Sequence, residues 1–340
     1  MNPKIKTALQ YIVTIGITVL LVWLSLRGLN LGGKHEGQGT ADLIWNAWTR
    51  SNKGYLVLMA ILLMISHMFR AERWRMLLEP SGHKGTYSNS FLSVMVGYLV
   101  NLAIPRGGEV SRCYNLFQLE KTPVEISFGT VVVERLVDVL CMLTLVCISF
   151  IVEWDKLEVF MSTLDFSGNG TKPKFSPLLI IVVAGVIAVV LLIYFLRNNP
   201  RVKKLLNGFK EGFLGLFRLR NKWLFIAYSI IIWGLYFLMS YSVMFAFDET
   251  SHLGLSAVLT IFAIGAIAMA APLPGGAGSY HLLLPMGLVS LYAMDRADAV
   301  AFVFIFHAWQ TLVLAFFGFV CLLISLWLIR KKNKNGTVAQ

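Results

Sequence analysis

Three ionisable residues recur at a regular spacing around a glycine pair in the first half of the chain. Arg106, Glu109 and Arg112 are three residues apart, so on a helix they share one face. Arginine side chains bind phosphate through charge-assisted hydrogen bonds, and a nearby glutamate can balance their charge. The spacing therefore indicates a site for an anionic or zwitterionic group.

A second charged group interrupts a long apolar stretch. Glu134 and Asp138 lie four residues apart on the expected helix, with Arg135 between them. A charge at depth in a membrane span costs at least about 2.5 kcal/mol, so we expect Arg106 or Arg112 to pair with one of the two carboxylates. Two interpretations stay open. One is an ion-pair network that only locks two helices, and the other is a charged cavity for a lipid headgroup or a proton relay.

Two glycine pairs, each next to proline, interrupt the apolar stretches 87–104 and 255–291. Segments 104–111 and 272–279 align without gaps, and only the glycine pair and a serine are identical. Proline ends a helix, and glycine allows a tight turn. The next helix then starts with unpaired N–H groups that suit a phosphate. The alternative is a pair of kinks that only ease packing. The residues concerned are Pro105, Gly107, Gly108, Pro272, Pro274, Gly275 and Gly276.

Two histidines belong to the second half. His281 follows Gly278 by three residues, and His307 lies inside the last apolar run. Either imidazole can titrate near neutral pH or form a hydrogen bond to a substrate, and either can equally be an interior histidine with a structural partner.

Another polar group follows the second apolar run. His67, Arg70, Arg73 and Trp74 lie where the chain is expected to leave the membrane. Arginine and tryptophan are common at the membrane–water interface. We expect this group to anchor the span there.

The composition fixes the class of protein that must position these residues. Of 340 residues, 57% are hydrophobic and 14% are charged, and the mean hydropathy is +0.69. Soluble domains carry about 25% charged residues and lack apolar runs of about 20 residues, so the chain is expected to be an integral membrane protein. The net charge of +12 is then a signal of orientation, and nucleic acid is not an expected partner.

We expect an all-α polytopic membrane protein, a single domain over 1–340, with about six full spans and two re-entrant hairpins at the broken stretches. The expected spans are 8–26, 55–69, 128–152, 177–196, 223–247 and 299–329.

Loop charges predict the orientation. Basic residues dominate 70–86, 197–222 and the C-terminal tail, whereas 153–176 and the turn near 248 are acidic. The positive-inside rule then places both termini in the cytoplasm.

This orientation requires each broken stretch to return to the side from which it enters. The first hairpin is expected to open to the cytoplasm and the second to the outside. Halves of about 54–152 and 223–329 would then form an inverted repeat, and Gly/Pro-interrupted segments in such repeats mark the central site of transporters.

Segment 201–220 has apolar residues at helical spacing and basic residues between them. It is expected to be an amphipathic helix on the cytoplasmic leaflet, where it would bind anionic lipid.

Motifs in both halves resemble the lysylphosphatidylglycerol synthase transmembrane-region family. The pattern N-x-x-x-P-R-G-G-E…R…E-R-x-x-D runs from Asn101 to Asp138, and 70–74 and 272–278 also fit. The family includes flippase-like bacterial proteins and the membrane half of multiple peptide resistance factor. The resemblance implies movement of a phospholipid or lipid-linked headgroup between leaflets.

One departure limits what the resemblance implies. The aminoacyl-lipid synthases carry a large soluble domain after the spans, and this chain ends soon after 329. Synthase activity is therefore not expected, and lysylphosphatidylglycerol is a doubtful substrate.

The leading hypothesis is a lipid flippase of the bacterial cytoplasmic membrane, acting on phospholipids or polyprenyl-linked lipids without a cofactor or a metal. Homo-oligomerisation is left open. The expected headgroup-binding residues are Asn101, Arg106, Gly107, Gly108, Glu109, Arg112, Gly275, Gly276, Gly278 and His281, and those expected to balance charge or couple transport are Glu134, Arg135, Asp138 and His307.

Two other classes of function are weighed against it. A membrane enzyme that transfers a group to or from a lipid phosphate could use Glu109, Glu134 and Asp138 as acids, bases or metal ligands. Neither a nucleophile–base pair nor a metal-spaced histidine cluster is evident in the sequence. The third class is a non-transporting scaffold of cell-envelope machinery.

Overall fold

The computed structural model describes residues 3–26, 39–83, 85–154, 214 and 218–337, and no strand occurs among them. The α-helices are α1 (Pro3–Leu26), α2 (Thr40–Arg50), α3 (Lys53–Leu78), α4 (Tyr87–Ala103), α5 (Gly107–Glu120), α6 (Val124–Val152), α10 (Lys222–Met244), α11 (Asp248–Ser251), α12 (Leu255–Ala270), α13 (Ser279–Tyr292) and α14 (Arg296–Thr337). Short 3₁₀-helices, η2 (Glu79–Ser81) and η3 (Pro274–Gly276), follow α3 and α12. The predicted all-α class is therefore confirmed.

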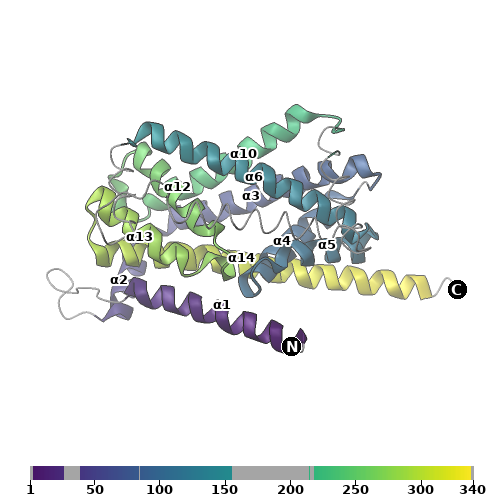
Figure 1. Cartoon of the computed structure of the whole chain (residues 1–340), viewed down its shortest axis with the longest axis horizontal. Helices are drawn as coiled ribbons and strands as arrows, with labels where there is room; N and C mark the ends of the chain where they lie inside the picture. Colours follow the sequence, from purple (N-terminus) through teal and green to yellow (C-terminus); the bar gives the residue numbers. More distant parts are fainter. Residues whose placement is uncertain (1–2, 27–38, 84, 155–213, 215–217, 338–340) are drawn as a thin grey trace, which may run out of the picture.

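Long apolar helices dominate the bundle (Figure 1). Segments Lys53–Ser81, Lys222–Met244 and Arg296–Asn333 are long and apolar enough to cross a membrane, and Ile15–Leu26 and Leu255–Ala270 are shorter apolar helices. This pattern is that of a helical membrane protein. The predicted span 177–196, and all of the predicted amphipathic helix except 214 and 218–220, lie outside the described residues.

The helix that contains the second predicted span is longer than expected. The sequence placed the end of that span at 69, but α3 continues to Leu78. Arg70 and Arg73 lie inside it with 2% and 0% of their surface exposed. They are therefore not loop charges, and the positive-inside argument for 70–86 loses both of them.

The first broken stretch folds into an antiparallel helical hairpin of α4 and α5. The two helices approach closely at Gly97 and Gly108, because a Cβ on Gly108 would lie 2.1 Å from the Gly97 carbonyl oxygen. Asn101 supports the turn, since its Oδ1 accepts a hydrogen bond of 2.7 Å from the Gly108 N–H. Near the open end, Asn115 donates to Ser93 Oγ over 3.1 Å.

The second broken stretch forms a hairpin of α12 and α13 with a longer turn. Ser279 at the start of α13 donates to the Ala268 carbonyl oxygen over 2.7 Å. Gly275 and Gly276 have φ values of +57° and +74°, which glycine adopts without steric cost. In the first hairpin the left-handed residue is instead Arg106, with φ +59°, which aligns with Pro274 and not with a glycine. The two aligned glycine pairs therefore have different backbone roles.

The hairpins open toward opposite ends of the bundle. The end of α5 lies beside the end of α14, where Lys332 Nζ donates to the Leu119 carbonyl oxygen over 3.2 Å. The end of α13 lies beside the end of α6, where Tyr292 Oη donates to Glu153 over 2.6 Å. Figure 1 shows that α1 begins and α14 ends on the side to which the α4–α5 hairpin opens.

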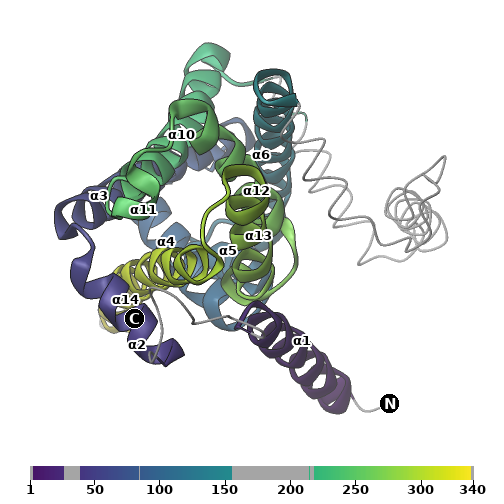
Figure 2. The ribbon, with the colours of Figure 1, turned by 90° about the vertical axis from the view of Figure 1, so that its left-hand side faces the viewer.

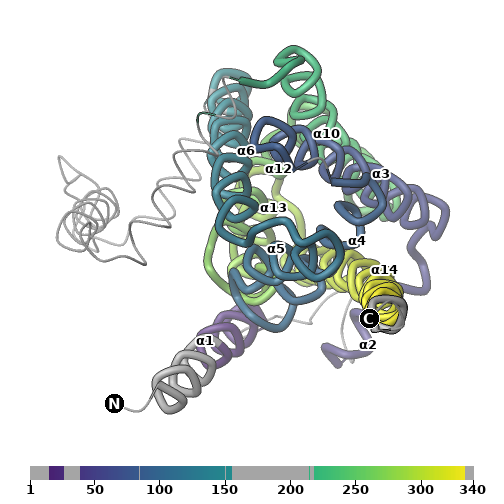
Figure 3. The backbone as a smooth tube through the Cα atoms, turned by 90° about the vertical axis from the view of Figure 1, so that its right-hand side faces the viewer, coloured from purple at the N-terminus to yellow at the C-terminus, as the bar shows by residue number. Residues whose placement is uncertain are grey.

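The two halves are joined through their first helices and through their hairpins. Helices α3 and α10 run antiparallel along their length, with Asn52 bonded to Ala246 at one end and Arg73 bonded to Ser229 near the other. Each hairpin packs its first helix on the last helix of the other half, α4 on α14 and α12 on α6 (Figure 3). The two halves are therefore interlocked through their hairpins.

Helix α1 lies at the edge of the bundle (Figure 2). It contacts the second hairpin, where Leu21 lies against Gly278 and Ser25 Oγ donates to the His281 carbonyl oxygen over 2.6 Å. The main apolar core lies instead among α3, α4, α10, α12, α13 and α14.

Replacement of Gly108 tests the close approach in the first hairpin. We expect Gly108→Ala to destabilise the protein by about 1–3 kcal/mol, because the new methyl group meets backbone and the Asn101 side chain. Thermal unfolding of the detergent-purified protein measures the change. Gly234→Ala in α10 is the matched control, since a Cβ there meets nothing within 4 Å. Equal melting temperatures for the two variants would contradict the described packing.

Candidate functional site

A buried carboxylate joins three arginines from two helices. Glu134 of α6 is 0% exposed and accepts hydrogen bonds of 2.5 Å from both Arg70 of α3 and Arg112 of α5. Arg73, one turn after Arg70 on α3, lies 3.3 Å from the same carboxylate. The expected pairing of Arg112 with a carboxylate of α6 is therefore present, and α3, α5 and α6 are tied together at one point.

Asp138 extends this cluster by one helical turn. Its oxygens accept hydrogen bonds of 2.8 Å from Arg70 and 2.7 Å from Arg73. Arg135 lies 3.6 Å from Asp138 and 3.4 Å from Glu109 of α5. Apart from Arg106, the acids and bases of the two sequence groups thus form one continuous network.

Aromatic rings cover the arginines. The guanidinium of Arg112 lies 4.3 Å from the ring centre of Trp74, and that of Arg70 donates to Tyr236 Oη of α10 over 3.1 Å. Trp74 is itself fixed by a hydrogen bond of 3.0 Å to Thr130. Such contacts suit arginine, whose planar cation stacks on aromatic faces.

The prediction that His67, Arg70, Arg73 and Trp74 anchor a span at the interface was wrong. All four are at most 2% exposed. Their side chains point into the bundle because α3 continues past the predicted end, so the face that carries them is covered by α4, α6 and α10. Their recurrence at three- and four-residue spacing was the signal that one helix face is polar and buried.

A cavity of about 410 Å³ lies beside the network, between the two halves. Both hairpins and both long helices α10 and α14 contribute to its wall, and much of the wall is apolar. Its polar and charged lining residues are His67, Arg70, Tyr98, Asn101, Arg106, Glu109, Arg135, Asp138, Trp233, Tyr236, Ser240, Tyr280, His307, Gln310 and Thr311.

The residues predicted from sequence divide into two sets around this cavity. Those that line it are Asn101, Arg106, Glu109, Arg135, Asp138, Gly275, Gly276 and His307. The others lie behind the wall or in the hairpin turns: Gly107, Gly108, Arg112, Glu134, Gly278 and His281.

The tips of the two hairpins contact each other at this cavity. Arg106 donates to the Ala270 carbonyl oxygen over 2.9 Å, and Leu102 lies against Gly275. The N–H groups of Gly107 and Gly108 donate within the first hairpin, to Ile104 and Asn101. They are therefore not open to a phosphate, in contrast to the expectation from sequence, and the side chain of Arg106 is the donor that faces the cavity.

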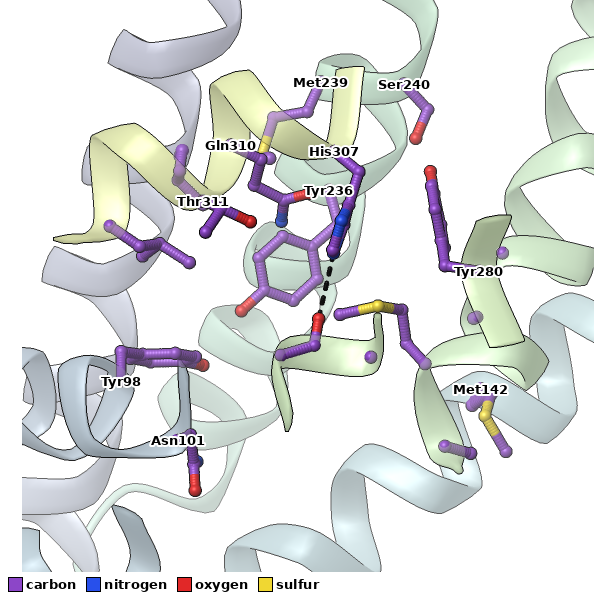
Figure 4. Close-up of a pocket in the computed structure, with 18 of the residues that line it drawn as sticks. Tyr98, Asn101, Met142, Tyr236, Met239, Ser240, Tyr280, His307, Gln310 and Thr311 are labelled. Carbon is purple, nitrogen blue, oxygen red and sulfur yellow. Dashed lines mark hydrogen bonds between the residues drawn. The ribbon is translucent and has the colours of Figure 1, made fainter. Parts of the chain in front are cut away.

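The two histidines of the second half have backbone partners. His307 Nε2 donates to the Gly275 carbonyl oxygen over 3.0 Å, which fixes the turn of the second hairpin to α14 (Figure 4). His281 Nδ1 accepts from the Gly278 N–H over 3.3 Å. The two rings meet edge to face with centres 4.7 Å apart. His307 thus borders the cavity, whereas His281 supports the turn behind it.

Apart from Asn101, the neutral polar side chains of the cavity were not predicted from sequence. Figure 4 shows Tyr98, Tyr236, Gln310 and Thr311 around the same space as His307. Single tyrosines, glutamines and threonines inside apolar runs give little signal on their own, because the same residues also occur in helix contacts. Among the described residues, no group of three His, Cys, Asp or Glu side chains is arranged to hold a metal ion.

The fold and this site define a helical membrane protein with a charged cavity between two interlocked halves. The family model of the lysylphosphatidylglycerol synthase TM region matches residues 11–318, so the chain belongs to that family, as its motifs predicted. A UPF0104 membrane protein of Methanocaldococcus jannaschii is 34% identical over 100 residues, which are 28% of this chain and 30% of that protein. No solved structure matches the chain.

The buried cluster generates a prediction about stability. We expect Glu134→Gln to cost about 3–5 kcal/mol, because two arginines that donate to Glu134 would lose a charged acceptor in a fully buried site. Glu72→Gln is the control, since Glu72 pairs with Arg75 on the helix surface and such pairs contribute about 0–1 kcal/mol. Thermal unfolding in detergent compares the two. A similar small loss for both would show that the cluster does not hold the helices together.

Proposed function

We propose that this protein moves a lipid headgroup that carries a phosphate from one membrane leaflet to the other. Arg106 carries the proposal. It lies at the tip of the first hairpin, it lines the cavity, and it has no carboxylate within salt-bridge distance in the described part of the chain. Its side chain is exposed, and an arginine without a carboxylate partner that faces a cavity of a helical membrane protein is expected to mark a substrate site.

The surrounding charges support an anionic ligand. Glu109 and Asp138 on the cavity wall each lie near Arg135, so their charge is balanced by the protein. Headgroup oxygens would then bind Arg106, while the apolar part of the wall covers the first carbons of the lipid chain. The buried cluster around Glu134 would hold the first hairpin in place during this exchange.

The hairpin tips provide a route for alternating access. The contact from Arg106 to Ala270 joins the two halves, and a phosphate at Arg106 would compete with that carbonyl oxygen. Binding would thus loosen the junction between the tips and let one side of the cavity open. Transporters with inverted repeats place their substrate site between such broken helices.

The proposal includes a membrane topology. Six spans, counting 177–196, and two re-entrant hairpins would place both termini in the cytoplasm of a bacterial inner membrane. Its support is that the hairpins open to opposite ends and that α1 begins on the side where α14 ends (Figure 1).

Cysteine labelling tests this topology. We expect Lys121→Cys, after α5, to react with a membrane-impermeant maleimide from the cytoplasmic side and Ala293→Cys, after α13, from the outside, because the two hairpins open to opposite ends. Cys113, Cys141, Cys147 and Cys321 are first replaced by alanine. Labelling of both positions from one side would contradict the arrangement.

A flipping assay with fluorescent lipids in liposomes tests the function. We expect the purified protein to accelerate exchange of a phosphate-bearing lipid over empty vesicles, and Arg106→Gln to slow it by about tenfold or more. A hydrogen bond to a charged group contributes about 1.5–3 kcal/mol, and 1.4 kcal/mol corresponds to about tenfold in rate.

Arg50→Gln in α2 is the control for this assay, because Arg50 is exposed and does not line the cavity. Melting temperatures of both variants separate loss of function from loss of fold. Rates equal to those of empty vesicles for anionic, zwitterionic, cationic and polyprenyl lipids alike would refute transport.

A further inference from the structure

The charges in and behind the cavity wall do not cancel. The arginines are Arg70, Arg73, Arg106, Arg112 and Arg135, and the carboxylates are Glu109, Glu134 and Asp138. Three carboxylates balance three of these five cations, so two positive charges are left over. Arg70, Arg73, Arg112, Glu134 and Asp138 are buried among the helices, where an uncompensated charge is costly, whereas Arg106 is exposed at the cavity.

Polar side-chain atoms on the same wall also lack hydrogen-bond partners, and a neutral imidazole offers one donor and one acceptor nitrogen. Both ring nitrogens of His67 and the Nε1 of Trp233 are buried and have no hydrogen bond, and His67 is 1% exposed. His67 lies against the ring of Tyr98, with centres 4.2 Å apart, so its ring is fixed in place. Buried polar atoms are rarely left unpaired, and such groups at a cavity indicate a missing partner.

These two observations narrow the class of ligand beyond anions in general. The ligand must carry two negative charges to neutralise the cavity, and it must be rich in acceptor oxygens to satisfy donors from α3, α10 and the tip of the first hairpin. A phosphomonoester meets both needs, since it has three terminal oxygens and a charge near −2 above pH 7. A phosphodiester carries one negative charge, and a zwitterionic headgroup carries none overall.

One unpaired acceptor lies on the same wall. Oε2 of Glu109 has no hydrogen bond, while Oε1 of the same carboxylate is 3.4 Å from Arg135. The cavity therefore also has a place for one hydroxyl group beside the phosphate. This acceptor does not change the charge balance, because the charge of Glu109 is already counted.

We propose that the cavity selects lipids that end in a phosphomonoester or pyrophosphate, such as phosphatidic acid or a polyprenyl phosphate, over phosphodiester and zwitterionic phospholipids. This inference rests on the proposed function for placing a lipid in the cavity. Apolar lining residues, among them Leu63, Met142 and Phe262, would cover the first carbons of the chain.

Binding to the purified full chain in nanodiscs tests this selectivity. Phosphatidic acid, phosphatidylglycerol and phosphatidylethanolamine with identical acyl chains are titrated at pH 8 and constant ionic strength. We expect phosphatidic acid to bind about tenfold more tightly than phosphatidylglycerol, with phosphatidylethanolamine weakest. Equal affinities for the first two lipids in the wild-type protein would overturn the proposal.

The pH dependence separates ligand charge from protein charge. The second ionisation of a phosphomonoester lies near pH 6, so at pH 5 phosphatidic acid has one charge and its advantage over phosphatidylglycerol should shrink severalfold. The acids and bases that face the site, His67, His307, Glu109 and Asp138, act on both lipids alike. A preference unchanged at pH 5 would count against recognition of the second charge.

Two further measurements show whether the site binds a lipid phosphate or free phosphate, and which residue recognises the phosphate. Inorganic phosphate should displace phosphatidic acid but bind at least tenfold more weakly, and equal affinity would show a site for free phosphate. Arg106→Gln should reduce the preference for phosphatidic acid while Arg50→Gln preserves it, and both should keep the wild-type melting temperature. An unchanged preference in Arg106→Gln would contradict the assignment.

The outcomes also distinguish this inference from transport itself. Equal flipping of phosphatidic acid and phosphatidylglycerol, together with equal binding, would leave the proposed function standing and remove only the selectivity. Selective binding of phosphatidic acid without flipping of any lipid would keep the site and refute transport.

Discussion

The structure depends on one buried carboxylate. Glu134 accepts hydrogen bonds from arginines of α3 and α5 while it is carried by α6, so a single residue fixes three helices against each other. In an apolar environment each of these ions alone would be costly, and only the complete set is tolerated. The position of the first hairpin, and with it the position of Arg106, follows from this cluster.

The cluster also explains how a structural network and a charged cavity occur together. From the sequence, a structural network and a charged cavity were alternatives. In the structure, different residues of the same cluster belong to the network and to the cavity wall. Glu134, Arg112 and Arg73 lie behind the wall, whereas Arg106 and Glu109 face the cavity. Arg70 and Asp138 belong to both sets. The proposed transport therefore needs no rearrangement of the buried pairs, because a ligand would meet only the outer members.

The features predictable from sequence are those encoded by local pattern. Apolar runs predicted the helical class, the Gly/Pro breaks predicted where α4 and α12 end, and the spacing of Glu134 and Asp138 indicated a buried network. The roles of Arg70 and Trp74 were missed because the end of a span was judged from hydropathy, which falls where charges appear even when the helix continues.

The two aligned glycine pairs have different roles in the structure, and the alignment could not show this. Gly108 is needed for contact with Gly97, whereas Gly275 and Gly276 are needed for their dihedral angles, and both needs select the same amino acid. The neutral cavity residues such as Tyr236 and Gln310 are brought together only by tertiary packing between the halves.

The exchange of hairpins between halves bears on biogenesis. Helix α4 packs along α14, the last helix of the chain, and Gly318 of α14 lies against the backbone of Met95. About 190 residues separate the end of α4 from the start of α14. At about 5–20 residues per second, the first hairpin waits roughly 10 to 40 s for its partner during synthesis. Throughout that interval the first hairpin is held only by its own half, through apolar packing on α3 and α6 and through the salt bridges of Glu134. The Glu134 cluster therefore also serves as part of the early scaffold on which the rest of the protein is assembled.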